Sequence, residues 1–292
     1  MAASPFYAVL LIYLAVLGQA AAQAQPPLPA KRIATLAPFL AELVFAAGAG
    51  SKLVAVSAHS DYPLAARSLP VIADAGAVNR ESLLALHVDT VLAWKGGTPG
   101  KNIDAARQSG AQVIILDGDR LDDIPRLLRR IGDLAGTRHQ AETEAVRFEE
   151  GLSEVRRKYG PRRQISAMFE IWHRPLMTIS GKHFMSDALG VCGGRNVFAD
   201  YPGIAPEVSM ESVLKEKPTA IIGAGSARSE REFRENWTGN GAIAAVKREH
   251  LIYLDADYIQ RQTPRILEGV RRLCVALDEI RRSPTATQTA RP

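Results

Sequence analysis

The sequence predicts an α/β fold of two Rossmann-like lobes with parallel sheets, joined by a single long backbone α-helix. Short β-branched segments alternate with helical segments in both halves of the chain, as in parallel sheets covered by helices. Between the halves, residues 138–160 have the pattern of one long helix. A short motif of the first half also recurs in the second. We therefore place the N-terminal lobe at 32–137, the linking helix at 138–160 and the C-terminal lobe at 161–281.

In the N-terminal lobe, short apolar runs predict strands, and stretches with 3.6-residue periodicity predict helices. Pro38 begins the first helix and Gly48 follows its end, which agrees with the preferences of proline and glycine for helix ends. The predicted strands are Arg32–Leu36, Leu53–Val56, Thr90–Trp94 and Gln112–Leu116, and the predicted helices are Pro38–Ala47, Arg80–Leu86, Lys101–Gln108 and Leu121–Leu134.

The linking helix is predicted over Arg138–Tyr159, with a length of about 33 Å at the usual rise per residue. We expect Thr137 to cap its start and Gly160-Pro161 to end it. Beyond it, the alternation of strands and helices resumes. It covers Gln164–Ile171, Phe184–Leu189, Ala220–Gly223 and Leu251–Leu254, before a closing helix over Pro264–Arg281.

The two lobes share an internal repeat. Residues 79–84 (Asn-Arg-Glu-Ser-Leu-Leu) precede the strand at 90–93, and residues 209–214 (Ser-Met-Glu-Ser-Val-Leu) precede the strand at 220–223. Each copy places a helix-capping residue two positions before a Glu-Ser pair. The match predicts two similar lobes with a ligand cleft between them, while chance agreement stays an alternative.

The N-terminus predicts export to the periplasm. The apolar run from Phe6 to Leu17 is too short to span a bilayer, and small residues follow it. We assign 1–24 as a signal peptide cleaved after Ala22 or Ala24, with a short membrane anchor as the alternative. Flexible segments are predicted on either side of the folded part, as a leader at 25–31 and a disordered tail at 282–292.

Two cysteines, Cys192 and Cys274, occur in the chain. An even number of cysteines in an exported protein favours a disulfide. Closing a loop of roughly eighty residues would stabilise the fold by about 4–5 kcal/mol in the chain-entropy model. Two buried free thiols remain the alternative.

The sequence offers no catalytic signature. The net charge of +5 is spread along the chain, so no nucleic-acid surface is expected. Residues 93–97 lack the spacing of a phosphate-binding loop, and no Gly-x-Ser-x-Gly elbow is present. We predict a binding protein with no cofactor and no resident metal. The alternative from another class is a metal-dependent periplasmic enzyme that holds zinc through His173 and His183.

Aromatic and polar residues gather where predicted strands end. His59 and Tyr62 follow one strand, Trp94 closes another, and Trp172 with His173 follows a third. Asp257, Tyr258 and Arg261 follow a fourth. Ligands of open α/β sheets lie outside the carboxyl ends of the strands. These residues therefore predict a site for a large, flat, partly polar ligand.

Glu81 and Glu211 occupy equivalent places in the two copies of the repeat. A carboxylate in the first turn of a helix is favoured by the helix dipole, which is a sufficient structural reason for both. The functional alternative is that one glutamate on each lobe meets arginines of a two-subunit membrane permease.

Several motifs resemble the periplasmic cobalamin-binding receptors of ABC importers, within the helical-backbone (class III) solute-binding proteins. The resemblance runs from about Arg32 to Leu277. Its distinctive segments are Ser60-Asp61-Tyr62-Pro63, Ala93-Trp94-Lys95-Gly96-Gly97, Val191-Cys192-Gly193-Gly194-Arg195-Asn196-Val197-Phe198, and Pro264-Arg265-Ile266 leading to Leu273-Cys274.

The resemblance implies a monomeric receptor that captures a corrinoid between its lobes and delivers it to a permease. It implies a disulfide between Cys192 and Cys274, a cleft aromatic at Trp94, and a corrin-contacting loop at 257–261. It also gives Glu81 and Glu211 the permease-docking role.

This chain departs from the best-known member of the family at the predicted cleft. His59 replaces a corrin-contacting Tyr, Ala75 replaces a cleft Trp, and Tyr258-Ile259-Gln260 replaces Trp-Phe-Glu. Haem or a ferric siderophore therefore remains an alternative ligand. His59 is expected either to coordinate the metal of the ligand or to hydrogen-bond its amide rim.

Overall fold

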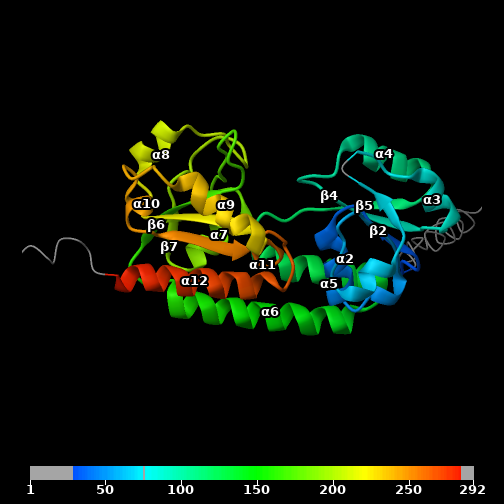
Figure 1. Cartoon of the computed structure of the whole chain (residues 1–292). Coiled ribbons are helices and arrows are strands. Elements are labelled where there is room, and N and C mark those ends of the chain that lie inside the picture. Colours follow the sequence, from blue (N-terminus) through cyan, green and yellow to red (C-terminus); the bar gives the residue numbers. More distant parts are fainter. Residues whose placement is uncertain (1–28, 75, 284–292) are drawn as a thin grey trace, which may run out of the picture.

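The computed structural model describes residues 29–74 and 76–283. The chain forms two α/β lobes, and one long helix runs beneath both of them (Figure 1). This is the predicted fold class. The predicted signal peptide, residues 25–28 of the predicted leader and residues 284–292 of the predicted tail lie outside the described residues. Among the described helices, none is long and apolar enough to cross a membrane.

The N-terminal lobe is built on a parallel sheet with strand order β3-β2-β1-β4-β5. Strand β4 is buried on both faces, because Leu92 joins one hydrophobic core and Val91 joins another. Its elements are β1 (Ile33–Thr35), α2 (Pro38–Ala46), β2 (Leu53–Ser57), β3 (Val71–Ala73), α3 (Arg80–Ala85), β4 (Thr90–Trp94), α4 (Gly100–Gln108), β5 (Gln112–Leu116) and α5 (Asp123–Ala135).

The C-terminal lobe repeats this topology in a parallel sheet with strand order β7-β6-β8-β9. The order matches β2-β1-β4-β5 of the first lobe, so β8 stands where β4 stands. Its elements are β6 (Ile165–Glu170), α7 (Phe184–Val191), β7 (Gly194–Asn196), α8 (Met210–Glu216), β8 (Ala220–Gly225), α9 (Ala227–Trp237), α10 (Ala244–Lys247), β9 (Leu251–Asp255), α11 (Ala256–Ile259) and α12 (Ile266–Arg282).

The sequence repeat corresponds to equivalent structure. The side chain of Asn79 accepts a hydrogen bond from the Ser82 amide at the start of α3. The side chain of Ser209 does the same for the Ser212 amide at the start of α8. Each helix is followed by the central strand β4 or β8. The repeat is therefore structural, and chance agreement no longer explains it.

Helix α6 (Arg138–Tyr159) has the predicted bounds and runs beneath both lobes (Figure 1). Its buried residues recur every three or four positions, so one face packs against α2, α5, α7 and α12. The prediction that Thr137 caps this helix through its side chain was wrong. The side chain of Thr137 accepts no hydrogen bond from the first turn of α6; instead, its Oγ1 donates one to the Ala47 carbonyl at 2.7 Å. Thr137 thus ties α6 to the end of α2.

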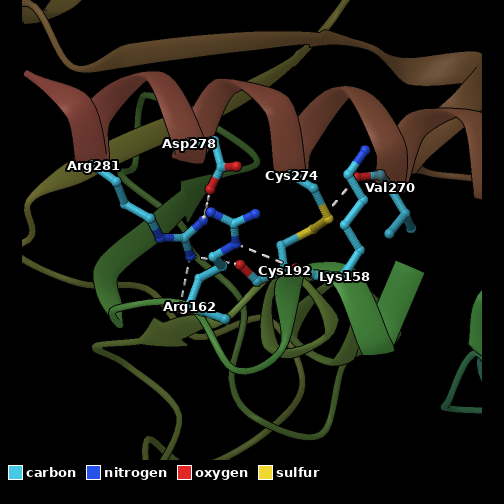
Figure 2. The surroundings of a disulfide bond; sticks show 8 residues. Lys158, Arg162, Cys192, Val270, Cys274, Asp278 and Arg281 are labelled. Atoms are coloured by element: carbon cyan, nitrogen blue, oxygen red, sulfur yellow. Dashed lines mark hydrogen bonds and ion pairs between the residues drawn. A yellow bond between two sulfur atoms is a disulfide. The ribbon is translucent and has the colours of Figure 1, made fainter. Parts of the chain in front are cut away.

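Cys192 and Cys274 form the predicted disulfide, which excludes the free-thiol alternative (Figure 2). The bond joins the end of α7 to the middle of α12, and both cysteines are fully buried. Arg281 donates to the Cys192 carbonyl at 2.6 Å (Figure 2). Gly193 has a φ of +68°, and a Cβ there would lie 2.8 Å from the Tyr159 carbonyl oxygen. The Cys-Gly-Gly turn therefore needs glycine at this position.

Candidate ligand-binding site

Most residues predicted to bind the ligand lie in two groups. Tyr62, Asp257, Tyr258 and Arg261 belong to a cluster between the lobes. Trp172 and His173 line a pocket of the C-terminal lobe. The structure thus brings residues from distant parts of the chain together, although it does not place all of them around one cavity.

The interlobe ion cluster consists of Glu42, Asp61, Asp257, Arg261 and Arg265. Glu42 projects from α2 of the first lobe, and its side chain is only 2% exposed. It accepts hydrogen bonds from Arg261 at 2.7 Å and from Arg265 at 2.8 and 3.0 Å. Arg261 also reaches Asp61 at 2.7 Å and Asp257 at 3.0 Å. Two arginines of the second lobe therefore hold carboxylates of the first.

Each charge in this cluster stabilises its neighbours. The hydrogen bond from Arg261 lowers the pKa of Asp61 against the opposing effect of burial. Burial alone would lower the pKa of Arg261, but its bonds to Asp61 and Glu42 outweigh burial and raise it. Asp61 and Arg261 consequently stay ionised near neutral pH. The cluster is a fixed electrostatic link between the lobes.

Two of the predicted aromatics pack on the same cluster. The Arg265 guanidinium lies 3.7 Å from the ring centroid of Tyr62 and 5.3 Å from that of Tyr258. Both distances are within the range of cation–π attraction. Tyr62 is an exposed residue from the first lobe, whereas Tyr258 belongs to α11 of the second. The arginine therefore positions one aromatic ring from each lobe.

A pocket of about 510 Å³ opens at the carboxyl ends of β6 and β8. Trp172 is 62% exposed, and its Nε1 donates to the Arg174 carbonyl at 2.9 Å. Its neighbour His173 is held beside the carboxylate of Glu170, which closes β6. The pocket is lined by Glu170, Ile171, Trp172, His173, Arg174, Gly223, Ala224, Ser229, Glu232, Phe233, Asn236 and Tyr253.

Trp94 and His59 lie apart from this pocket. Trp94 ends β4 and packs edge-on against Phe39 of α2, with ring centroids 5.6 Å apart. Added Cβ atoms at Gly96 and Gly97 would lie 2.6 and 2.3 Å from the Trp94 ring, so the Trp-Lys-Gly-Gly motif folds its backbone over the indole. His59 is exposed on the loop after β2, where its backbone φ is 65°.

His183 has a structural role. It stands before α7, where its Nδ1 accepts a hydrogen bond from the Met185 amide at 3.2 Å. Burial lowers the pKa of His183 to about 4, which keeps the ring neutral and able to accept. Among residues 29–74 and 76–283, no group of three or more His, Cys, Asp or Glu side chains could hold a metal ion.

A larger cavity, of about 1030 Å³, lies between β9 and α12. None of the predicted ligand-binding residues lines it. Its wall includes Arg272 and Glu268, which form an ion pair with each other at 2.9 Å. The position of a ligand at the carboxyl ends of parallel strands favours the smaller pocket.

Glu81 and Glu211 lie in the first turns of α3 and α8, on opposite lobes (Figure 1). Both are exposed, and the side chain of neither forms an ion pair with another described residue. In each helix the next buried position, Leu83 or Val213, anchors the turn in its lobe. The pair is therefore presented to solvent from two rigid supports.

Sequence reasoning missed two carboxylates of the site. Glu42 lies within the apolar stretch Pro38–Ala46 and is the only charged residue of that helix. Glu170 closes a buried strand and accepts a hydrogen bond from Trp237. A lone charge in an otherwise buried element needs a partner, so that pattern could have identified both.

Two lobes of equivalent topology on a shared helix, with polar and aromatic residues at their strand ends, define a two-lobed solute-binding receptor. The chain belongs to the periplasmic binding protein family, whose model matches residues 33–258. This family is a class of binding proteins rather than enzymes.

The curated relatives include vitamin B12-binding proteins. The protein from Vibrio parahaemolyticus is 30% identical over 254 residues, covering 87% of this chain and 92% of that protein. The protein from Yersinia pestis is 33% identical over 273 residues, covering 94% and 92%. The predicted family resemblance is thereby confirmed.

Solved structures show the same fold. The periplasmic vitamin B12 binding protein BtuF of Vibrio cholerae superposes with a TM-score of 0.79 at 31% identity, covering 87% of this chain and 99% of that chain. The periplasmic heme-binding protein RhuT from Roseiflexus has a TM-score of 0.74 at 20% identity, covering 86% and 99%. The comparison with RhuT shows only that the two proteins share a fold.

Proposed function

We propose that this protein is a periplasmic receptor that binds vitamin B12 or another corrinoid between its lobes and delivers it to an ABC importer. The observation that carries the proposal is the match to vitamin B12-binding proteins over nearly the whole chain, at 30–33% identity. The proposal includes export by the predicted signal peptide, a monomeric state, and no enzymatic activity.

The pocket at the ends of β6 and β8 supports this ligand class. Trp172 offers an exposed aromatic surface, and Glu170, Ser229 and Asn236 offer hydrogen-bonding groups beside it. A corrinoid is a large ring with an amide rim, so it needs both kinds of contact. Tyr62 and Tyr258, held by Arg265, would complete the binding surface from the side of the ion cluster.

The architecture supports a receptor that changes shape little on binding. Helix α6 packs against helices of both lobes, and the interlobe ion cluster adds a second link. Such connections restrict hinge bending. A largely preformed site loses less conformational freedom on binding, which favours tight capture of a scarce ligand.

A thermal-shift panel tests the ligand class. Cyanocobalamin should raise the melting temperature of the purified chain, whereas haemin and a ferric siderophore should not. Trp172→Ala should reduce the cyanocobalamin shift, while Val275→Ala, at an exposed site on α12, serves as the matched control. A shift with haemin and none with cyanocobalamin would replace the corrinoid with haem.

A further inference from the structure

A carboxylate and an imidazole lie side by side on the wall of the C-terminal pocket. The side chain of Glu170 is 8% exposed, and its Oε2 accepts a hydrogen bond from Trp237 Nε1 at 2.5 Å. The other oxygen, Oε1, lies 3.4 Å from Nδ1 of His173. The His173 ring also packs edge-on against Trp237, with centroids 6.2 Å apart. The imidazole is therefore held between a carboxylate and an indole.

The two nitrogens of His173 have different surroundings. Nδ1 is buried without an aligned hydrogen bond, and it faces Glu170. The side chain nevertheless keeps 20% of its surface exposed, and the residue lines the pocket. Because Nδ1 is buried, Nε2 is the ring nitrogen that can be reached from the pocket. In the tautomer that carries its proton on Nδ1, the Nε2 lone pair is available to a ligand in the pocket.

A carboxylate behind one imidazole nitrogen is the usual support of a metal-binding histidine, because it fixes the tautomer and raises the basicity of the other nitrogen. The described residues contain no cluster able to hold a metal ion by itself. A metal at His173 would therefore arrive with the ligand. Corrinoids carry cobalt, and imidazole nitrogen is a good ligand for such a transition metal.

We propose that His173, held by Glu170, coordinates the metal of the bound corrinoid through Nε2. The inference rests on the proposed function. Coordination replaces a weakly held axial water by the imidazole nitrogen, and the released water carries no charge away, so the metal keeps its oxidation state. The receptor should therefore bind corrinoids with an exchangeable axial position more tightly than corrinoids without one.

His59 is the rival imidazole, and the geometry favours His173. His59 is exposed on a loop, and its ring forms no hydrogen bond with any side chain of the described residues. It would lose its rotamer freedom on coordination. His173 is already restrained by Glu170 and Trp237, so less freedom remains to be lost.

Two corrinoids that differ at the axial position test the proposal. Aquocobalamin offers an exchangeable water, whereas cyanide occupies that position in cyanocobalamin. The wild-type chain should shift the visible absorption of aquocobalamin and bind it at least about tenfold more tightly than cyanocobalamin. His173→Ala should abolish both the shift and the preference. Glu170→Gln should reduce the preference by about tenfold. His139→Ala, at an exposed position on α6, should change neither.

The outcomes separate this inference from the proposed function. If calorimetry detects binding of both corrinoids but the absorption of aquocobalamin does not shift, the proposed receptor function stands and the proposed coordination by His173 is overturned. If the absorption shift disappears in His59→Ala but persists in His173→Ala, His173 is not the residue that coordinates the metal. Failure to bind either corrinoid overturns the proposed function. In that case, the Soret band of haemin with wild type and His173→Ala decides whether His173 binds a metal chelate.

Discussion

Replacement of Glu42 by glutamine should lower the free energy of unfolding by about 3 kcal/mol, because two partly buried guanidiniums would lose the buried carboxylate that they share. Water cannot replace the lost charge at a site that is almost fully buried. Glutamine keeps the volume of glutamate, so no cavity contributes. Arg261 retains Asp61 and Asp257, whereas Arg265 has no other carboxylate within ion-pair distance in the described part of the chain. Most of the lost stability should therefore come from the broken ion pair between Glu42 and Arg265.

Scanning calorimetry at pH 7 measures this effect. A loss of about 3 kcal/mol corresponds to a fall in Tm of roughly 6–12 °C in a protein of this size. Glu150→Gln, at an exposed position of α6, is the matched control and should stay within about 0.5 kcal/mol of wild type. Adding Arg265→Met to Glu42→Gln removes the unpaired charge. The double variant should be about 1–3 kcal/mol more stable than the summed single effects.

Two results would refute this reasoning. One is a Glu42→Gln loss no larger than that of Glu150→Gln. The other is strict additivity of Glu42→Gln and Arg265→Met, because residues that share a buried ion pair must be coupled. Either result would mean that the ion pair between Glu42 and Arg265 does not stabilise the contact between the lobes.

Serine at both Cys192 and Cys274 should lower stability by about 4.5 kcal/mol in urea unfolding, since the disulfide closes a loop with a sequence separation of 82; equal urea midpoints for variant and wild type would contradict this. Burial lowers the pKa of His183 from 6.5 to about 4, so its contribution to stability is present above pH 6.5 and is lost as pH falls toward 4. Between pH 7 and pH 4 the wild type should lose roughly 3 kcal/mol more than His183→Asn, which keeps a capping acceptor but does not titrate; parallel stability profiles would exclude this. Glu81→Arg together with Glu211→Arg should leave corrinoid affinity intact while transporter-dependent uptake in cells fails, and unchanged uptake would exclude the docking role.

Elements with long, buried and periodic sequences were predictable. The bounds of β4, β5 and α6 agree with the sequence prediction to the residue. Strands β3 and β7 were missed for a physical reason. Each has three residues, and Gly194-Arg195-Asn196 has no apolar pattern at all. These short edge strands form because β2 and β6 offer them backbone partners, and such pairing leaves little signal in a local sequence.

The candidate site was predictable in its residue types but not in its pairings. The aromatics at strand ends could be recognised because strand ends could be located. The buried ion-pair partner of Arg261 could not be recognised, because Glu42 lies 219 positions away in the sequence. Likewise, the Glu170–Trp237 hydrogen bond spans 67 positions. Only the folded chain brings such groups together, so local patterns indicate that a buried charge needs a partner without indicating which one.

A calorimetric titration of the purified, signal-free chain with cyanocobalamin tests the central claim most directly. The account predicts saturable binding of one corrinoid per chain, with weaker binding by Trp172→Ala because the exposed indole at the end of β6 is lost. Absence of binding heat, in a sample that melts cooperatively and binds haemin or a ferric chelate instead, would contradict the corrinoid assignment.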